Sequence, residues 1–517
     1  MKNKLFVAIT LLSTTLSFAQ ISSVQVDELV NRTIKTFNVP GIAVAIVKDG
    51  KVVLAEGYGV KSIETKEKVD ANTLFGIASN SKAFTSAALA MLVDEGKIKW
   101  DDKVIKYLPN FRMYNEYVTQ EFTIRDLLTH RSGLGLGAGD LMIWPDGSNF
   151  TVQDIIQNLQ YLKPVSAFRT KYDYDNLLYI VAGEVIHVVS GTSWCDFVEE
   201  RIMKPLEMNN SAASFVRLAD TTNIIAPHVP IDGKLKVIKR YKNQLFDAAA
   251  GIYSSVNDLS KWAIMQMNNG KYGAENKQLF SEKEHAEMWT PQTLIPIKTI
   301  APYNSHFKAY GLGWFLSDVK GYKEVTHTGG LEGIVTQTTY FPELQLGIIV
   351  LTNQQSGAAF NAITNTIKDS YLGIKSADYV ALYNNRLKAN EDSADKVTDE
   401  VWAAVAKNKN AKIKPDFKTV TGTYKDSWFG DVIISETKGK LFFESKRSSQ
   451  LKGDVFFYKE GNYVVKWDNA YLHADAHLIF QFDERGKATS LKMKPISELT
   501  DFSYDFQDLD FIKTDTN

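Results

Sequence analysis

Strand patterns at both ends of a long helical stretch constrain the fold of this chain most. Two β-rich runs, 41–47 and 51–55, flank the dipeptide Asp49-Gly50, which is a strong hairpin signal. Two more strand patterns, 335–341 and 346–351, come much later in the chain. Helical patterns occupy 24–37, 152–161, 177–189 and 256–268. We therefore expect an α+β fold, with an antiparallel sheet assembled from both ends of this segment and flanked by helices.

The C-terminal region has a different pattern. Residues 377–411 are charged and helical, without a strand pattern or a strong apolar face, which indicates a helical linker. Beyond Pro415, short β-rich runs alternate with turn clusters, and this predicts a small all-β barrel. The runs are 432–434, 441–443, 455–458, 463–465 and 478–480. We divide the chain into four parts: 1–19, 20–375, 376–412 and 413–517.

The first 19 residues have the pattern of a signal peptide. Lys2 and Lys4 precede a short apolar stretch, 5–16, and Ser17-Phe18-Ala19 supplies small residues at the two positions that a signal peptidase reads. The apolar stretch is too short to span a bilayer. We expect cleavage after Ala19 and export to the periplasm or the outside of the cell, without a membrane anchor.

Composition and charge exclude some classes of partner. The chain of 517 residues is 44% hydrophobic and has a formal net charge of -1, so nothing points to a nucleic-acid partner. Cys195 is the single cysteine, so no internal disulfide can form and stability must come from the core. We interpret Cys195 as a small buried hydrophobe rather than a nucleophile.

The segment Ser79-Asn80-Ser81-Lys82 places a hydroxyl and an amine one turn apart at the start of a predicted helix, 79–95. A serine becomes a good nucleophile when a base takes its proton, and a neutral amine in a dry pocket can do so. The helix N-terminus also favours an anion. The motif is short, however, and its weight depends on what accompanies it.

A second cluster, Tyr174-Asp175-Asn176, lies at the entrance of the predicted helix 177–189. The Tyr174 hydroxyl can move protons, and the Asn176 amide can hold both Lys82 and a substrate through hydrogen bonds. Taken alone, the cluster is more typical of a turn that carries a half-buried tyrosine.

A third cluster, His327-Thr328-Gly329-Gly330, precedes the strand pattern 335–341. We expect His327 on a strand edge, where it supplies a hydrogen bond or a positive charge near the pocket. The small residues Gly329 and Gly330 let the backbone approach a substrate, and the Gly330 amide can point at a developing oxyanion.

In the order Ser-x-x-Lys, Tyr-x-Asn, His-x-Gly, these clusters resemble the serine hydrolases of the β-lactamase and penicillin-binding-protein fold, on the class C and D-aminopeptidase/esterase side. The resemblance runs from about residue 24 to residue 372. Further matching stretches are 75–78, 127–134, 249–252, 311–314 and 350–353. The C-terminal part, including 501–506, resembles the lipocalin-like domain that follows some of these hydrolases.

The resemblance implies a role for each matching residue. Ser79 is then the nucleophile, Lys82 its proton acceptor and Tyr174 the base or leaving-group acid. Asn176, His327 and Gly329 bind or orient the substrate, and the backbone amides of Ser79 and Gly330 form the oxyanion hole. His327 stands where many β-lactamases carry lysine, so peptidase or esterase activity is expected more than strong β-lactamase activity.

The sequence therefore predicts an exported serine hydrolase that forms an acyl-enzyme with small peptides or amides, including those with D-residues, or with esters. Two alternatives stay open: a carboxylesterase, and a penicillin-recognising or ligand-binding sensor without turnover. We expect no cofactor and no metal, since His473 and His477 lack further ligands at zinc spacing. The loop 133–138 follows a helix rather than a strand, which excludes a dinucleotide site and suggests a flexible pocket rim. The barrel either caps the active site or is a closed core without a cavity.

Overall fold

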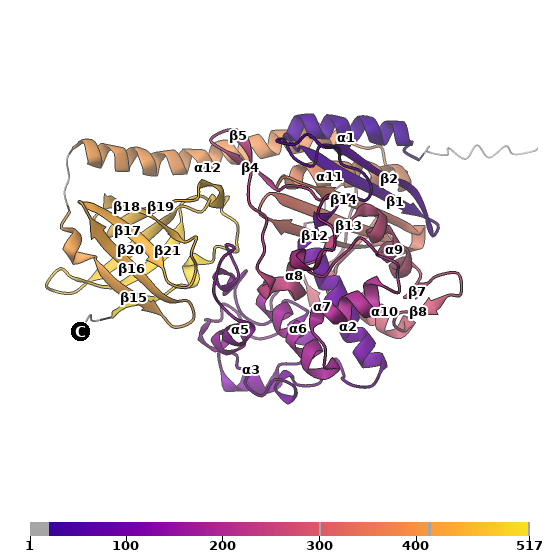
Figure 1. Cartoon of the computed structure of the whole chain (residues 1–517), viewed down its shortest axis with the longest axis horizontal. Coiled ribbons are helices and arrows are strands. Elements are labelled where there is room, and N and C mark those ends of the chain that lie inside the picture. Colours follow the sequence, from indigo (N-terminus) through magenta and orange to yellow (C-terminus); the bar gives the residue numbers. More distant parts are fainter. Residues whose placement is uncertain (1–19, 299–300, 412–414, 515–517) are drawn as a thin grey trace, which may run out of the picture.

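The computed structural model describes residues 20–298, 301–411 and 415–514. Two domains lie side by side, and a long helix, α12 (Tyr379–Asn410), runs along both of them (Figure 1). The predicted signal peptide and its cleavage after Ala19 lie outside the described residues. The predicted helical linker corresponds to α12.

The first domain is built on an eight-stranded antiparallel sheet with the order β2-β1-β14-β13-β12-β11-β10-β9. Its strands are β1 (Gly41–Lys48), β2 (Lys51–Gly59), β9 (Thr293–Leu294), β10 (Lys308–Tyr310), β11 (Phe315–Val319), β12 (Tyr322–Leu331), β13 (Ile334–Phe341) and β14 (Leu346–Thr352). In register, Val44 on β1 lies opposite Glu56 on β2 and Val350 on β14. The sheet is thus assembled from both ends of the segment, as predicted.

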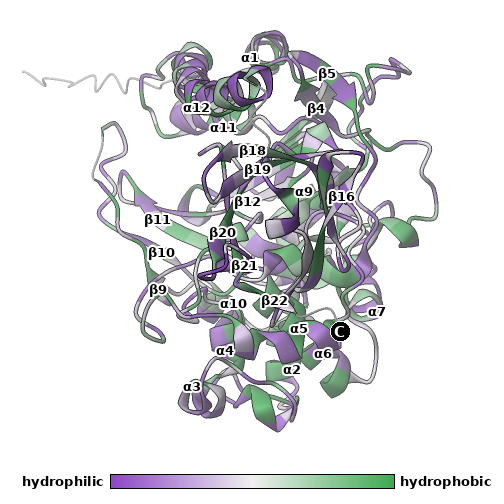
Figure 2. Ribbon diagram, turned by 90° about the vertical axis from the view of Figure 1, so that its left-hand side faces the viewer, coloured by the Kyte–Doolittle hydropathy of each residue, from purple (hydrophilic) through white to green (hydrophobic). Residues whose placement is uncertain are grey.

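The two faces of the sheet pack against different helices. Ile42, Val44 and Ile46 point to one face, where they join a core with α1 (Ser23–Phe37) and α11 (Gly357–Tyr371). The alternate residues of β1 join the larger core on the other face. In Figure 2, α1, α11 and α12 lie together above the sheet. Because successive side chains of a strand point to opposite faces of the sheet, β1 contributes residues to both cores.

Helices fill the second face and surround α2 (Ser81–Asp94), the helix that follows the candidate nucleophile. The helical segments of this region are η1 (Ala78–Asn80), η2 (Val104–Lys106), α3 (Glu116–Glu121), α4 (Ile124–Leu127), η3 (Asp140–Met142), α5 (Val152–Asn158), η4 (Leu159–Tyr161), α6 (Leu177–Ser190), α7 (Trp194–Val198), η5 (Glu199–Met203), η6 (Phe215–Arg217), η7 (Gln244–Phe246), α8 (Asp247–Ala250), α9 (Val256–Met267) and α10 (Glu282–Met288). Every residue from Ser81 to Leu92 is buried. Helices α6, α7, α8 and α10 enclose α2 on several sides, so it is buried all round.

Short two-stranded ribbons complete the first domain. They pair β3 (Phe75–Gly76) with β6 (Tyr253–Ser254), β4 (His228–Ile231) with β5 (Lys234–Val237), and β7 (Lys271–Tyr272) with β8 (Lys277–Gln278). Among the described residues, no single helix has the length and apolar character to cross a membrane. Two consecutive helical segments, Leu177–Ser190 and Trp194–Met203, reach that length and apolar character only when taken together, and the chain bends by 77° between them.

The second domain is a closed barrel in which each strand pairs with the next and the last returns to the first. Its strands are β15 (Gly422–Asp426), β16 (Gly430–Thr437), β17 (Lys440–Ser445), β18 (Lys452–Lys459), β19 (Asn462–Trp467), β20 (Ala476–Phe482), β21 (Ala488–Pro495) and β22 (Phe511–Thr514), with the short helices η9 (Phe417–Thr419), η10 (Ala470–Leu472) and η11 (Phe506–Asp508). Lipocalins share this up-and-down arrangement. Closure removes free sheet edges, which explains how a small β domain avoids edge pairing.

The linker helix has an apolar stripe that the sequence analysis did not recognise. Val401 and Val405 of α12 are buried against Val464 and Ile496 of the barrel. The charged composition of α12 did not indicate this contact, because a helix can pack against another element when only every third or fourth of its residues is apolar.

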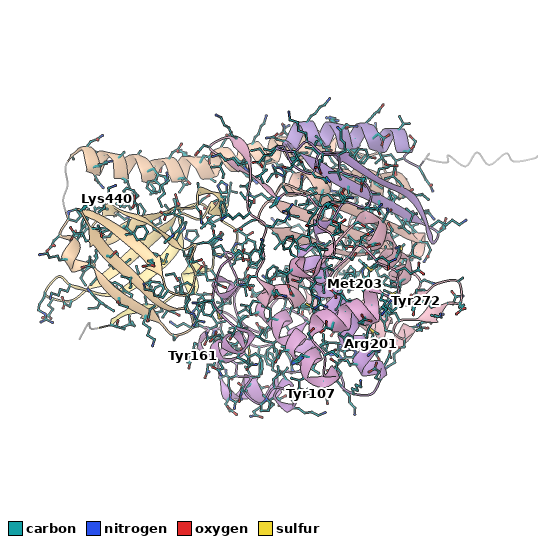
Figure 3. All side chains as sticks on the ribbon, in the orientation of Figure 1. Tyr107, Tyr161, Arg201, Met203, Tyr272 and Lys440 are labelled. Atoms are coloured by element: carbon teal, nitrogen blue, oxygen red, sulfur yellow. The ribbon has the colours of Figure 1, made fainter. Side chains whose placement is uncertain are left out.

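The domains meet through a packed interface. Arg447 of the barrel lies over the Phe150 ring, 3.9 Å from its centroid, and its guanidinium contacts the Asp154 carboxylate at 2.9 Å. Tyr161, at the end of η4, marks the side of the first domain that faces the barrel (Figure 3). Buried residues of both domains belong to one continuous hydrophobic core. The barrel is therefore packed against the first domain and is not a loosely tethered appendage.

Candidate active site

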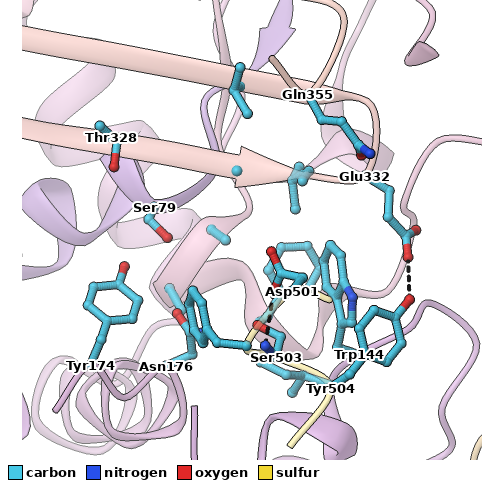
Figure 4. A pocket seen from close by; sticks show the side chains of 18 of the residues that line it. Ser79, Trp144, Tyr174, Asn176, Thr328, Glu332, Gln355, Asp501, Ser503 and Tyr504 are labelled. Carbon is cyan, nitrogen blue, oxygen red and sulfur yellow. Dashed lines mark hydrogen bonds between the residues drawn. The ribbon is translucent and has the colours of Figure 1, made fainter. Parts of the chain in front are cut away.

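Ser79 lies in a tight 3-10 turn, η1, immediately before α2. The residue before it, Ala78, has a φ of 50°, a left-handed conformation that costs energy for a residue other than glycine. The helix predicted to begin at Ser79 thus begins as an α-helix only at Ser81. The turn projects the Ser79 side chain toward a cavity (Figure 4).

The turn is fixed to the sheet by Asn80. Its amide nitrogen donates to the Thr336 hydroxyl at 2.9 Å, and the Thr338 hydroxyl donates to its carbonyl oxygen at 2.8 Å. Both threonines are on β13, and Asn80 is buried. A buried amide whose donor and acceptor are both used holds the backbone beside it rigidly.

Lys82 reaches back from α2 to Ser79. Its Nζ lies 3.1 Å from Ser79 Oγ, 2.7 Å from Asn176 Oδ1 and 3.1 Å from the Ala249 carbonyl oxygen. The side chain is fully buried. A lysine in this position has hydrogen-bond partners but no solvent.

Burial lowers the pKa of Lys82 to about 7, although the charges of Asp140 and Asp175 oppose the shift. Desolvation disfavours the charged ammonium, so near neutral pH a large share of Lys82 is the free amine. A free amine beside a serine hydroxyl is a competent general base.

Asn176 is held by Asp140, a residue that the sequence analysis did not single out. Asn176 Nδ2 donates to Asp140 Oδ2 at 2.7 Å, which leaves Oδ1 to accept from Lys82. Asp140 is completely buried, and burial raises its pKa well above the ordinary value. Nothing local marks Asp140, because its partner comes from a different part of the chain.

Tyr174 lines the cavity next to Ser79, and the Lys82 ammonium nitrogen lies 4.8 Å from its ring centroid. Burial raises the pKa of Tyr174 well above its usual value, although a hydrogen bond with Ser79 acts in the opposite direction. Tyr174 therefore keeps its proton at neutral pH and can donate it.

His327 is placed differently from the prediction. It lies on β12, which is an interior strand between β11 and β13 rather than an edge. Its Nδ1 lies 2.6 Å from the Thr328 carbonyl oxygen and its Nε2 lies 2.9 Å from the Tyr310 hydroxyl. A carbonyl only accepts, so Nδ1 carries the proton and Nε2 accepts from Tyr310.

Burial lowers the pKa of His327 to about 3, and the nearby Lys82 charge adds to the effect. His327 is therefore neutral, with both ring nitrogens engaged. The positive charge considered from the sequence is not supplied by this residue at neutral pH.

His130 lies directly behind the site. Its ring centroid lies 4.2 Å from that of Tyr174 and 4.4 Å from that of Tyr310. Its Nδ1 accepts a hydrogen bond from the Asp175 amide at 3.0 Å. Burial lowers its pKa well below the usual value, so His130 supports the Tyr174 ring as a neutral imidazole.

The two glycines of the third cluster have separate roles. A Cβ on Gly329 would lie 2.2 Å from the Ile77 carbonyl oxygen, so this glycine allows β12 to approach the Ser79 turn. Gly329 is buried and is not among the residues that line the cavity, and its part in substrate binding stays a prediction. Gly330 lines the cavity beside Ser79, and a Cβ there would meet open space.

The cavity in front of Ser79 has a volume of about 550 Å³, a size suited to small ligands. The barrel supplies part of its wall through residues including Tyr471, Leu499, Phe502, Ser503 and Tyr504. Leu136, from the predicted rim loop, also lines it. Of the two roles considered for the barrel, the structure thus shows that it closes one side of this cavity, while its own interior is a packed core.

Charged side chains around the cavity are few. Glu332 and Asp501 line it, and no lysine or arginine does so within the described ranges. Tyr504 donates a hydrogen bond to Glu332 at 3.2 Å (Figure 4), and burial raises the pKa of Glu332 to about 8. No group of three or more His, Cys, Asp or Glu residues suited to a metal ion occurs in the part of the chain that the structure describes.

The single thiol lies away from this cavity. Cys195 is half-buried and donates a hydrogen bond to the Asp247 carboxylate at 3.4 Å. Burial raises its pKa, so the nucleophilic thiolate is disfavoured. This environment agrees with a structural role.

Comparison with known proteins gives matches to both domains. The family described as Beta-lactamase matches residues 26–372, and one described as Domain of unknown function (DUF3471) matches residues 406–513. The Unguisins hydrolase ungD of Aspergillus violaceofuscus is 29% identical over 408 residues, covering 74% of this chain and 68% of that protein. Protein flp of Staphylococcus aureus is 28% identical over 339 residues, covering 65% of this chain and 64% of that protein.

The chain spans about two thirds of the length of these relatives. Among solved structures, the octameric penicillin-binding protein homologue from Pyrococcus abyssi matches 95% of this chain and 100% of its own, with a TM-score of 0.60 and 20% sequence identity. This likeness establishes the fold.

Proposed function

Since this chain belongs to the beta-lactamase family, we propose that it is an exported serine hydrolase that forms an acyl-enzyme on Ser79. The family and the hydrolase-named relatives support the broader role of hydrolase. One observation carries the finer proposal: the Ser79 hydroxyl faces a cavity and lies 3.1 Å from the amine of Lys82, which is buried and has a pKa lowered to about 7. The predicted α+β fold followed by a barrel is confirmed.

In the acylation step, Lys82 takes the proton of Ser79 while Oγ forms a bond to the substrate carbonyl carbon. The carbonyl oxygen becomes an oxyanion that accepts from the backbone amides of Ser79 and Gly330. Each such donor is worth roughly 3–4 kcal/mol in comparable sites. The bond to the leaving group then breaks, and the leaving nitrogen or oxygen takes a proton from Tyr174.

The environments of Lys82 and Tyr174 divide the acid and base roles between them. The pKa of Lys82 is lowered to about 7, whereas that of Tyr174 is raised well above 10.0. Near neutral pH the amine therefore accepts the first proton and the phenol is a donor. In deacylation, Tyr174 takes a proton from the water that attacks the ester, and Lys82 returns its proton to Ser79 Oγ, so both residues regain their starting protonation states.

The cavity favours a small and largely uncharged substrate. Aromatic rings of Tyr172, Tyr174, Phe315 and Phe502 line it, and no fixed cation is present there to bind a substrate carboxylate within the described residues. We propose small peptides or amides, including those with D-residues, or esters as substrates. The neutral His327 supports the expectation that a peptidase or esterase reaction is preferred over β-lactam hydrolysis.

A carboxylesterase is the second candidate, and the aromatic lining favours it because such walls accommodate apolar alcohol and acyl groups. Turnover of p-nitrophenyl acetate compared with D-amino-acid anilides separates the two reactions. If only the ester is turned over by the purified protein, the carboxylesterase replaces the peptidase.

The decisive experiment replaces Ser79 with Ala in the mature protein. Turnover and covalent labelling by a serine-directed phosphonate should both disappear, and retained turnover excludes the mechanism. Intact-mass measurement during substrate incubation tests the sensor alternative, because a persistent adduct without product indicates a sensor. Export is tested by N-terminal sequencing of the secreted protein, which should begin at Gln20.

A further inference from the structure

A segment of the barrel enters the active site. The connection between β21 and β22 contributes Leu499, Asp501, Phe502, Ser503 and Tyr504 to the wall of the cavity that Ser79 faces. Figure 4 shows Ser503 and Tyr504 on the same cavity as Ser79 and Asn176.

This segment binds the Asp140 side chain and also the backbone amides of the residues on either side of Asp140. The Ser503 hydroxyl donates to Asp140 Oδ2 at 2.9 Å. The Asp505 carboxylate accepts from the Gly139 amide at 2.6 Å and from the Leu141 amide at 3.0 Å. Asp140, Ser503 and Asp505 are all buried. Three hydrogen bonds from the barrel thus fix the position of η3.

Asp140 in turn sets the orientation of the Asn176 amide. Its Oδ2 accepts from Asn176 Nδ2 at 2.7 Å, so Asn176 Oδ1 faces Lys82 at 2.7 Å. Lys82 Nζ then lies 3.1 Å from Ser79 Oγ. A continuous chain of hydrogen bonds therefore links the barrel to the nucleophile.

We propose that the barrel completes the active site, with Ser503 and Asp505 as positioning residues that hold Asp140 so that Asn176 presents its carbonyl oxygen to Lys82. This inference rests on the proposed acyl-enzyme function and extends it across the domain boundary. A flipped or mobile Asn176 would present its NH₂ group to the amine and remove an acceptor that orients the base.

The position of Asp140 affects the pKa of Lys82 as well as the orientation of Asn176. The charge of Asp140 raises the pKa of Lys82 against the larger effect of burial. The titratable groups that face Lys82 or Asp140 from the surrounding elements are Asp175, Tyr174 and Tyr179 at α6, His130 after α4, His327 on β12 and Asp505 in the barrel. Asp140 itself accepts a hydrogen bond from the barrel, through the Ser503 hydroxyl.

The first test compares two serines on the same domain interface. Ser503→Ala removes the hydroxyl that reaches Asp140, while Ser449→Ala removes a hydroxyl that bonds the Gly147 carbonyl oxygen at 3.1 Å outside the cavity. In the full chain, Ser503→Ala should lower kcat/KM by about tenfold, the size of one hydrogen bond to a charged group, mainly through kcat. Ser449→Ala should match the wild type, and Ser503→Thr, which keeps a hydroxyl, should recover most of the activity.

The second test reads the pH profile, which a purely structural defect would not move. Asp140→Asn removes a carboxyl group whose ionised form raises the pKa of Lys82, so wherever Asp140 is ionised the acid limb of kcat/KM should move to lower pH, while the maximum rate falls. Circular dichroism and a melting curve identify any variant that fails to fold. If Asp140→Asn is unfolded, the acid limb of Ser503→Ala gives the same readout, since losing that hydrogen bond raises the pKa of Asp140 and weakens its charge.

The outcomes separate this inference from the proposed function. Equal rates and profiles for Ser503→Ala and Ser449→Ala overturn the inference, as does a loss that Ser503→Thr fails to recover. If Ser79→Ala remains active, the proposed function itself is wrong. Loss of activity in Ser79→Ala together with an unaffected Ser503→Ala leaves the hydrolase standing and removes only the role of the barrel.

Discussion

The pH dependence of acylation tests the protonation state of Lys82 directly. Burial lowers the pKa of this lysine from 10.5 to about 7. At pH 7 about half of the enzyme then holds the free amine, compared with about three molecules in ten thousand for an ordinary lysine. Burial therefore increases the concentration of usable base by roughly a thousandfold, which is the main electrostatic contribution of the fold to the nucleophile.

The perturbation is a change of pH from 8 to 6. The fraction of neutral Lys82 falls from about nine tenths to about one tenth, so the acylation rate constant should fall by about tenfold. Below pH 6 each further unit should cost about another factor of ten. The assay is stopped-flow measurement of the p-nitrophenol burst from p-nitrophenyl acetate, because the burst isolates acylation from later steps.

Lys82→Arg is the matched control, since its guanidinium keeps a cation that does not lose its proton in this range. It should be inactive from pH 5 to pH 9. A wild-type profile that is flat across this range would refute the reasoning. An acid limb centred near pH 4 would do so as well, because it would assign the essential group to a carboxyl.

Three further predictions concern stability. Lys82→Met should abolish turnover, but it should raise the free energy of unfolding by up to about 5 kcal/mol at pH 6, less the cost of the lost hydrogen bonds. Melting curves at several pH values should show this gain shrinking between pH 7 and pH 10, because in that range only the unfolded wild-type protein keeps the lysine proton. Gly329→Ala should lower both the melting temperature and kcat, because its Cβ meets the Ile77 carbonyl, whereas Gly330→Ala should melt like the wild type. Asn80→Ala should cost about 2–3 kcal/mol of stability in a urea titration, since it removes two buried hydrogen bonds to β13 and leaves the buried Thr338 hydroxyl without its acceptor.

Local patterns determined what the sequence could predict. The hairpin around Asp49-Gly50 and the helix α6 depend on turn chemistry and apolar spacing within a few residues, and both form where expected. The closed barrel also follows from short strands at regular spacing. Local structure places each of the catalytic candidates: Ser79 and Lys82 lie one turn apart, and Asn176 directly precedes α6. In the structure both Ser79 and Asn176 contact the Lys82 amine.

Packing between distant segments determined what the sequence could not predict. Asp140 bonds Ser503 across most of the chain, and neither residue belongs to a recognisable motif. Gly329 was assigned to the substrate because a glycine pair suggests an approachable backbone, but the contact it permits is with the Ser79 turn. The position of His327 inside the sheet depended on strands that the sequence did not reveal, β10 and β11.

The divided wall of the cavity has a consequence for comparing homologues. A sequence trimmed at residue 372, where the family match ends, keeps the nucleophile but discards Phe502 and Tyr504 and with them part of the chamber. Two enzymes with identical serine, lysine and tyrosine can then differ in what they admit. Exchange of the C-terminal module between lineages offers a way to alter substrate preference while the catalytic chemistry stays unchanged.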